Sequence, residues 1–322
     1  MRRLAVLTSG GDAPGMNAAV RAVVRAGVEM GFEMSGVRNG FAGLIRGEFL
    51  SLGCRNVGGI IDRGGTFLGS SRCEEMYQES GQEAALRSLR DYALDGLIVI
   101  GGNGSQSGAL ALSRRGFPVV GIASTIDNDL AGTDISLGAT TALEIAVQAI
   151  DRLRVTASSH RRAFLVEVMG RHCGYLALVA GIASGAEAIV IPEVPTGAED
   201  VARELLAAES RGKKHAIVVV SEGAPQNADQ IGRWFADHHE RLGFELRVTR
   251  LGHIQRGGSP CVFDRMIATE LGAAAVQYLA SGEHGVVIGL KDHRPHASSL
   301  SMVLEQKQLD AGLLAIARTM SR

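Results

Sequence analysis

Two stretches share one pattern and decide the fold class: Leu4-Ala5-Val6-Leu7-Thr8-Ser9-Gly10-Gly11-Asp12 and Leu97-Ile98-Val99-Ile100-Gly101-Gly102-Asn103. In each, a short apolar run ends at a glycine pair and a small polar residue, and a helix-forming stretch follows. Continuous apolar runs are typical of strands buried on both faces of a mainly parallel sheet. Ligands bind beyond the carboxyl ends of such strands, where helix N-termini attract phosphate. Two ordinary strand-to-helix turns would show the same spacing, and the pattern alone leaves that alternative open.

The alternation of strands and helices continues along the whole chain. Further apolar runs occur at 119–122, 164–168, 188–191, 216–220 and 286–290. Helical patterns occur at 16–30, 83–92, 139–153 and 201–209. This order predicts a doubly wound α/β fold. The length of 322 residues suits two domains of roughly 150 residues.

Composition and charge exclude several classes of protein. Apolar residues make up 46% of the chain and charged residues 21%, as in ordinary globular proteins. A formal net charge of -1 provides no global field for nucleic acid or an anionic membrane, so we expect neither partner. No apolar stretch approaches the roughly 20 residues of a membrane span. The four cysteines lack zinc-like spacing, which favours reduced thiols and a cytoplasmic location.

A pair of carboxylates follows the apolar run 119–122, in the segment Thr125-Ile126-Asp127-Asn128-Asp129. If the segment is extended, residues two apart share a face, so Thr125, Asp127 and Asp129 would point together. One carboxylate could then take a proton from a hydroxyl while the other helps to hold Mg²⁺. An isolated Asp-x-Asp is more often an Asx-rich turn that caps the next helix.

Basic residues occur in short clusters that favour small anion pockets over one nucleic-acid face. The strongest cluster is Gly252-His253-Ile254-Gln255-Arg256-Gly257-Gly258, because guanidinium and imidazolium groups suit phosphate monoesters. On the helix after the first glycine turn, Asn17, Arg21, Arg25 and Glu29 are four residues apart and form one polar stripe. A solvent-exposed face explains this stripe by default, although two arginines one turn apart could also grip a phosphate.

Taken together, these motifs resemble the bacterial 6-phosphofructokinase family. The segments that carry the resemblance are 8–17, 64–72, 125–129, 166–171 and 251–260, in the family's order. The resemblance implies two doubly wound α/β domains, each with a mainly parallel sheet, and an active site in the cleft between them. It places nucleotide binding in residues 1–138 and about 255–304, and sugar-phosphate binding in 139–254 and about 305–322. It also implies a cytoplasmic homotetramer that transfers the γ-phosphoryl of ATP, with Mg²⁺, to O1 of fructose 6-phosphate, giving fructose 1,6-bisphosphate and ADP.

The resemblance assigns roles position by position. Asp127 matches the catalytic base, Thr125 and Asp129 match its neighbours around substrate and metal, and Arg72 and Arg171 match residues that neutralise the transferring phosphoryl. The substrate positions are Thr125, Asp127, Arg162, Met169, Gly170, Arg171, Glu222, Arg247, His253 and Arg256, with Arg162 and Arg247 reaching in from an adjacent subunit. The nucleotide positions are Gly11, Arg72, Cys73, Gly102, Asn103, Gly104 and Ser105. The pocket for an allosteric nucleotide or phosphoenolpyruvate comprises Arg21, Arg25, Arg154, Gly185, Glu187, Arg211 and Lys213.

Departures from the family pattern concentrate on the donor side. The family's metal-binding motif is Gly-Gly-Asp-Gly-Ser, and here Asn103 replaces the aspartate. An amide oxygen can ligate Mg²⁺ together with Asp129, but it carries no charge. Where ATP-using members carry an aromatic residue, an arginine and a methionine, this chain has Cys73, Tyr77 and Ser107, and Cys54 replaces an effector-pocket arginine. The sugar-phosphate positions match throughout.

Three other functions compete with an ATP-dependent kinase. Pyrophosphate-using relatives carry an aspartate where this chain has Gly104 and a lysine where it has Ser124, so ATP is favoured. A low-activity or inactive regulatory paralogue that binds sugar phosphate is the second alternative. A nicotinamide oxidoreductase is disfavoured, because the chain lacks a dinucleotide fingerprint.

Overall fold

The computed structural model describes residues 2–160, 162–243 and 245–320. The chain forms two compact units. Unit 1 comprises Met1–Thr140 and Arg256–Lys307, and unit 2 comprises Thr141–Gln255 and Gln308–Arg322. Within the described ranges, no helix has the length and apolar character needed to cross a membrane.

Unit 1 is built on a seven-stranded sheet with the order β11-β10-β5-β4-β1-β2-β3. The strands are β1 (Arg3–Thr8), β2 (Glu33–Val37), β3 (Phe49–Leu52), β4 (Gly96–Gly101), β5 (Val119–Ala123), β10 (Val286–Lys291) and β11 (Arg294–Ser299). The five central strands are parallel, and β3 and β11 pair antiparallel at the two edges. The central strands β1, β4 and β5 are buried almost throughout, as continuous apolar runs predict.

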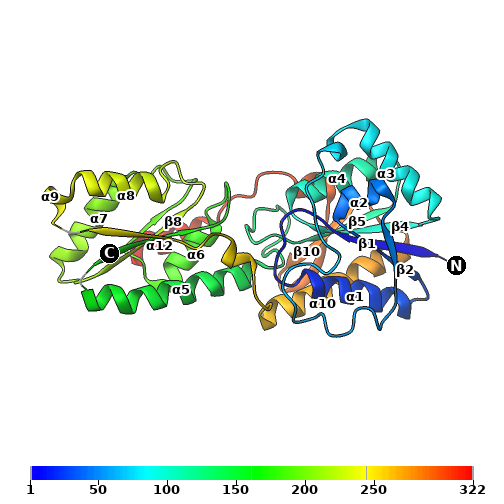
Figure 1. Ribbon diagram of the computed structural model, residues 1–322, viewed down its shortest axis with the longest axis horizontal. Helices are drawn as coiled ribbons and strands as arrows, with labels where there is room; N and C mark the ends of the chain where they lie inside the picture. Colours follow the sequence, from blue (N-terminus) through cyan, green and yellow to red (C-terminus); the bar gives the residue numbers. More distant parts are fainter. Residues whose placement is uncertain (1, 161, 244, 321–322) are drawn as a thin grey trace. The chain divides into compact units, whose positions relative to one another are not determined.

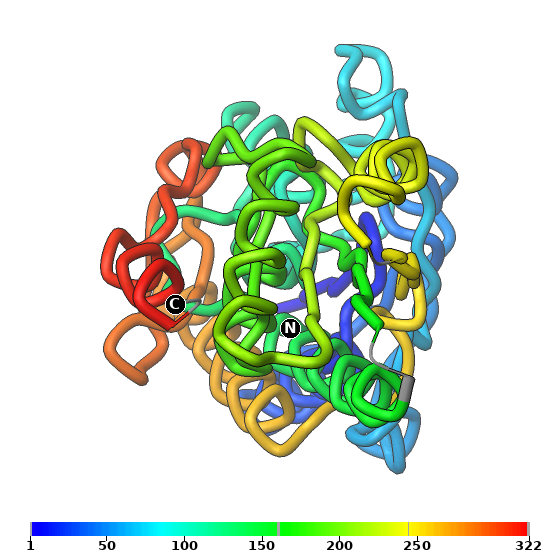
Figure 2. Tube along the Cα trace, turned by 90° about the vertical axis from the view of Figure 1, so that its left-hand side faces the viewer, coloured from blue at the N-terminus to red at the C-terminus, as the bar shows by residue number. Residues whose placement is uncertain are grey.

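Helices cover both faces of this sheet (Figure 1). Helices α1 (Met16–Glu29) and α10 (Val262–Ser281) lie on one face, and α2 (Gly40–Arg46), α3 (Glu79–Asp91) and α4 (Asn103–Arg114) lie on the other. The short helices η1 (Glu74–Tyr77) and α11 (Leu300–Val303) complete the unit. Figures 1 and 2 both show α10 alongside α1, although the two are far apart in the chain. Gly272 allows this close packing, because a Cβ there would lie 2.7 Å from the Cβ of Ala22.

Unit 2 contains a four-stranded parallel sheet with the order β7-β8-β6-β9. Its strands are β6 (Ala163–Val168), β7 (Ala188–Val190), β8 (Ala216–Ser221) and β9 (Leu246–Arg250). Its helices are α5 (Ala139–His160), α6 (Tyr175–Ser184), α7 (Ala198–Ser210), α8 (Ala228–Asp237), α9 (His239–Leu242), η2 (Gly252–Arg256) and α12 (Ala311–Met320). One core joins the sheet to α7 and α8 through residues such as Val218, Leu205 and Phe235. The predicted α/β class with mainly parallel sheets is confirmed in both units.

Sequence patterns do not predict the strands β2, β3, β9 and β11. Three of these lie at sheet edges, where one side of the strand is open to solvent and a continuous apolar run is unnecessary. Strand β9 shows the reason clearly, since Arg247, Val248 and Arg250 are all exposed.

Asn17 does not belong to the polar stripe predicted on α1. It is buried, its Nδ2 donates to the carbonyl oxygens of Arg63 (3.0 Å) and Gly64 (3.2 Å), and its Oδ1 accepts from the Phe67 N–H (2.7 Å). The amide therefore holds the loop 63–67, a contact that helical spacing cannot reveal. Arg21 is half-buried and Arg25 is exposed, so the exposed part of the stripe begins after Asn17.

Candidate active site

The two glycine turns lie side by side in unit 1, because β1 and β4 are parallel neighbours. The Ser9 N–H donates to the carbonyl oxygen of Ile100 (3.0 Å). A Cβ at Gly101 would lie 2.6 Å from the Ser9 carbonyl oxygen, so only glycine permits this approach. Helix α4 begins directly after the second turn, and no side chain caps its N-terminus. Its first N–H groups can therefore bind a phosphate.

Residues Thr125 to Asp129 follow β5, and we call them the catalytic turn after the role predicted for them. This segment is not extended as predicted: the chain turns at Ile126 and Asp127, and Asn128 has a left-handed backbone with φ 51°. The predicted common face is therefore wrong. Thr125 and Asp127 still meet, because the Asp127 N–H donates to Thr125 Oγ1 (3.2 Å). Both are buried, at 8% and 3% exposure.

The Asn128 side chain holds this turn from within. Its Oδ1 accepts from the Ser136 N–H (2.9 Å) and from Lys307 Nζ (3.0 Å), and its Nδ2 donates to the carbonyl oxygen of Asp134 (3.2 Å). The Ser136 hydroxyl also donates to the Thr125 carbonyl oxygen (2.6 Å). The alternative of a structural Asx-type turn thus fits Asn128, whose side chain binds within the loop 128–136.

Asn103 and Asp129 are in direct contact. Asn103 Nδ2 at the start of α4 donates to Asp129 Oδ2 over 2.7 Å, and both residues are half-buried. Mg²⁺ is commonly held by one or two carboxylates together with substrate phosphates, so this pair fits an ion that arrives with a nucleotide. The described residues contain no group of three or more His, Cys, Asp or Glu that could hold a metal. Phosphates and water would therefore supply most of the coordination.

Side chains near the first glycine turn come from distant segments of unit 1. Arg256 Nη1 donates to the Asp12 carbonyl oxygen (3.0 Å), and a Cβ at Gly11 would lie 2.5 Å from the same atom. Arg72 is exposed, and Cys73 beside it is half-buried. Burial raises the pKa of the Cys73 thiol, so the thiol stays protonated at neutral pH.

The predicted donor residues also meet Tyr77 from η1. A Cβ at Gly104 would lie 3.4 Å from the Tyr77 hydroxyl oxygen, so an exposed phenol stands beside the second glycine turn. Ser105 is buried, and Gly102 and Asn103 are half-buried. Among the predicted nucleotide positions, Gly11, Gly102, Asn103, Gly104 and Ser105 belong to the two glycine turns and the start of α4 in unit 1.

In unit 2, several predicted substrate residues gather at the carboxyl ends of β6 and β8. The Met169 N–H donates to Gln255 Oε1 (2.8 Å), and the Arg171 N–H donates to Glu222 Oε1 (3.0 Å). Gly170 has φ 135° and a Cβ there would lie 2.5 Å from the Cys173 carbonyl oxygen. Met169 is buried, but the Arg171 and His253 side chains are exposed.

Arg162 and Arg247 lie at the amino-terminal ends of the strands in the same sheet, opposite the ends that carry Met169 and Glu222. Arg162 precedes β6, and Arg247 near the start of β9 pairs with Phe164. At about 3.3 Å per residue, the length of β6 separates Arg162 at its amino-terminal end from Met169 at its carboxyl end by roughly 20 Å. Within unit 2, these two arginines therefore do not join Arg171 and His253.

Comparisons with known proteins assign the chain to a family. The phosphofructokinase family model matches residues 3–279. The chain is 50% identical to the ATP-dependent 6-phosphofructokinase of Thermotoga neapolitana and 48% identical to that of Brevibacillus brevis, with 100% of both chains covered in each case. The chain belongs to the phosphofructokinase family. The predicted family is thereby confirmed.

Solved phosphofructokinase structures share the fold. The Pichia pastoris enzyme in the T-state is 36% identical with a TM-score of 0.89, over 99% of this chain and 36% of that chain. The Saccharomyces cerevisiae enzyme is 37% identical with a TM-score of 0.86, over 94% of this chain and 45% of that chain. A pyrophosphate-dependent phosphofructokinase from Marinobacter aquaeolei is 22% identical with a TM-score of 0.85, a likeness of fold alone.

The effector positions predicted for this phosphofructokinase divide between the units. Arg21 and Arg25 lie on α1 of unit 1, and the others, Arg154, Gly185, Glu187, Arg211 and Lys213, belong to unit 2. Buried Glu187 accepts from Lys213 Nζ (2.7 Å) and from the Ile217 N–H (2.7 Å). Nε and Nη2 of Arg154 on α5 are buried without a hydrogen-bond partner among the described residues. The unit 2 set thus includes the Glu187–Lys213 ion pair and the Arg154 guanidinium, which could donate to an anion.

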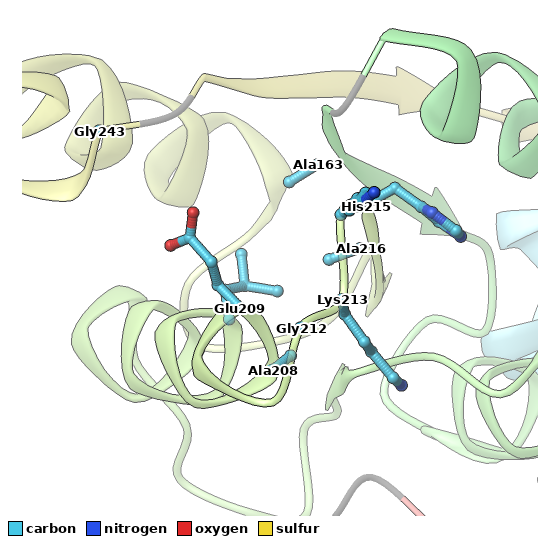
Figure 3. Close-up of a pocket in the computed structure, with 10 residues that line it drawn as sticks. Ala163, Ala208, Glu209, Gly212, Lys213, His215, Ala216 and Gly243 are labelled. Atoms are coloured by element: carbon cyan, nitrogen blue, oxygen red, sulfur yellow. The ribbon is translucent and has the colours of Figure 1, made fainter.

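A cavity of about 340 Å³ opens beside Lys213 (Figure 3). It is lined by the end of α7, by Ala163 and Ala216 at the amino ends of β6 and β8, and by Gly243. In Figure 3, the Lys213 side chain points away from that of Glu209. The cavity lies at the amino-terminal ends of β6 and β8, whereas Met169 and Glu222 follow the carboxyl ends of these strands, so the cavity is separate from those two residues.

Gln106 is a structurally important residue of the donor side that sequence patterns do not single out. It is fully buried on α4, and its Nε2 donates to the carbonyl oxygens of Gly101 (2.9 Å) and Ile122 (3.1 Å). The amide therefore connects the ends of β4 and β5, immediately before the second glycine turn and the catalytic turn. The sequence did offer one signal for Gln106: it is a polar residue on the face of α4 that packs against the sheet.

Proposed function

We propose that this phosphofructokinase transfers the γ-phosphoryl of ATP to O1 of fructose 6-phosphate, giving fructose 1,6-bisphosphate and ADP. The observation that carries the proposal is the buried catalytic turn beside the second glycine turn, joined by the Asn103–Asp129 contact. Relatives that match over their full length bear the name ATP-dependent 6-phosphofructokinase. The pyrophosphate-dependent neighbour is only 22% identical, so that alternative is not favoured.

In the proposed reaction, Asp127 accepts the proton of the O1 hydroxyl as that oxygen attacks the γ-phosphorus. The hydrogen bond between the Asp127 N–H and Thr125 Oγ1 keeps the turn in one geometry. The donor phosphates bind at the two glycine turns and at the uncapped N-terminus of α4. Asp129 and Asn103 hold the Mg²⁺ that arrives with ATP, and Arg72 and Arg171 neutralise charge on the transferring group.

We propose that Met169, Gly170 and Glu222 contact the sugar and that His253 and Arg256 bind its 6-phosphate. The backbone supports this set, because the Met169 and Arg171 N–H groups are held by Gln255 and Glu222. Domain roles follow from the same assignment: nucleotide on unit 1 and sugar phosphate mainly on unit 2. The assay compares ATP, GTP and pyrophosphate in parallel with fructose 6-phosphate, with Asp127→Asn as the blank. We expect fructose 1,6-bisphosphate with ATP and the least with pyrophosphate; no product with ATP would contradict the proposal.

We further propose a cytoplasmic homotetramer in which Arg162 and Arg247 serve the sugar-phosphate site of an adjacent subunit. They lie at the opposite ends of the strands from Arg171. This supports the arrangement, since one chain cannot bring Arg162 and Arg247 to the same phosphate as Arg171 and His253. Val262, Phe263 and Met266 at the start of α10 are 78%, 39% and 55% exposed, and we propose that a second chain covers them. An allosteric nucleotide or phosphoenolpyruvate would bind at the predicted effector positions.

Complementation tests the shared site. Co-expressed chains carrying either Asp127→Asn or Arg162→Ala should form mixed tetramers, in which one chain's Asp127 works beside the other chain's Arg162. We expect such mixtures to exceed the mean rate of the two parents by several-fold. Mixtures that only average the parental rates would place Arg162 in the site of its own chain.

A further inference from the structure

Lys307 is the last residue of unit 1, far from the catalytic turn in sequence but in contact with it. Its Nζ donates to Asn128 Oδ1 (3.0 Å) and to the Asp134 carbonyl oxygen (3.2 Å). The lysine is half-buried. Backbone contacts of the preceding residues hold this part of the chain without the lysine side chain. Gln306 forms a β-bridge with Leu130, and the Ala131 N–H donates to the Val303 carbonyl oxygen (3.2 Å).

The two acceptors of Lys307 lie at the two ends of one short loop. Asn128 occupies the catalytic turn between Asp127 and Asp129, and Asp134 lies just before Ser136, which also donates to Asn128 Oδ1. The ammonium group therefore closes the loop 128–134 with bonds of the charge-assisted kind, which are roughly twice as strong as neutral ones. A left-handed asparagine is sparsely populated and persists where its surroundings hold it.

We propose that Lys307 is a positioning residue for phosphoryl transfer, acting through Asn128 to hold the carboxylates of the catalytic turn in place. The inference rests on the proposed role of Asp127 as general base. In this assignment, Lys307 is no substrate position, and it donates hydrogen bonds to Asn128 and to the Asp134 backbone. Its loss should loosen the turn without unfolding the unit, because Ser136 still donates to Asn128 and the backbone pairing at Gln306 remains. Misplacing a catalytic group by about 1 Å can cost on the order of 10²-fold in rate.

The first experiment separates turnover from binding. In Lys307→Met, which keeps the length of the side chain but removes its charge and donors, we expect kcat to fall about 10- to 100-fold. KM for fructose 6-phosphate and for MgATP should stay within about threefold, since neither substrate contacts the lysine. Lys307→Arg should recover most of the loss. The matched control is Lys291→Met, which removes an exposed lysine of unit 1 and should leave all constants unchanged.

A double-mutant cycle tests the route through Asn128. Asn128→Ala removes the acceptor, so adding Lys307→Met to it should cost little more than Asn128→Ala alone. An unchanged kcat in Lys307→Met overturns the inference. A second outcome also overturns it: kcat falls in both Lys307→Met and Lys307→Arg, and the melting temperature falls in both variants. That result would show a purely structural role for Lys307.

Hydrogen exchange keeps this inference distinct from the proposed function. Amides 127–137 should exchange faster in Lys307→Met than in the parent or in Lys291→Met, with or without substrates. If the parent shows no kinase activity but exchange rises, the proposed function fails and the anchoring of the turn stands. If exchange is unchanged, the anchoring is wrong, whatever the activity of the parent.

Discussion

The catalytic turn of unit 1 and the predicted sugar-phosphate residues of unit 2 are held in different ways. In the turn, Thr125 and Asp127 are buried, and Asn128 is bound by partners from three other positions. In unit 2, hydrogen bonds hold the backbone at Met169 and Arg171, but the Arg171 and His253 side chains remain exposed.

The difference fits what each region is proposed to do. A general base needs a fixed distance to one hydroxyl, and the hydrogen bonds that Asn128 makes with Asp134, Ser136 and Lys307 would provide that geometry. Arg171 and His253 would bind phosphate and stay exposed, because burying a whole cation without a partner costs desolvation free energy. We therefore expect changes in the catalytic turn to alter turnover and changes among the exposed cations to alter affinity.

The largest expected effect is the loss of turnover in Asp127→Asn. The substitution keeps the shape of the side chain but removes the base, so kcat should fall about 10²- to 10⁴-fold. Calorimetry should show fructose 6-phosphate binding close to that of the parent. A variant that keeps most of its rate would show that Asp127 is not the base and that the whole turn is structural.

Asn103→Asp tests the contrast between the predicted donor positions, which depart from the family pattern, and the predicted sugar-phosphate positions, which match it. The new carboxylate would lie beside Asp129, where it repels without Mg²⁺ and adds a charged ligand with Mg²⁺. We expect kcat/KM for MgATP to rise by about 10-fold or more, with a steeper dependence on Mg²⁺ and unchanged fructose 6-phosphate binding.

Two controls accompany that measurement. Asn103→Leu removes the amide without adding charge and should not raise the rate. Intact-mass analysis excludes deamidation at the Asn103-Gly104 bond, since traces of aspartate would mimic the variant. If Asn103→Asp leaves the rate unchanged or lowers it, Cys73, Tyr77 and Ser107 become the better explanation for weak use of the donor.

His253→Ala tests the other side of the comparison. Removing one charged phosphate contact should raise KM for fructose 6-phosphate about 10-fold, while kcat at saturation changes little. Steady-state kinetics over a wide range of fructose 6-phosphate separates the two constants. A fall in kcat alone would mean that exposed cations of unit 2 position the reaction as the catalytic turn does.

The smallest expected effect concerns regulation. Arg21→Ala combined with Arg25→Ala should weaken the response to ADP or phosphoenolpyruvate a few-fold, because two cations of the predicted pocket are lost while Lys213 remains paired with Glu187. Cys54, in the position of an effector arginine, should already make the parent's response weak. Rate curves with and without each effector measure the change, and an unaltered response in a responsive parent would refute the pocket.

The sequence alone determined the fold class, the family and the identity of the candidate residues. Its apolar runs are local signals, because a strand buried on both faces must be apolar along its own length. Edge strands such as β9 are partly exposed and therefore lack such a run. The Asp-x-Asp of the catalytic turn and the glycine pairs are equally local. Their assigned roles remain predictions.

Only the tertiary structure decided which residues, candidates and others, meet in space. Lys307 reaches Asn128, Gln106 connects Gly101 with Ile122, and Asn17 turns inward to the loop 63–67. It also placed Arg162 and Arg171 at opposite ends of β6. Such contacts depend on how the sheet orders its strands and where the chain returns, and no spacing within a single segment encodes either.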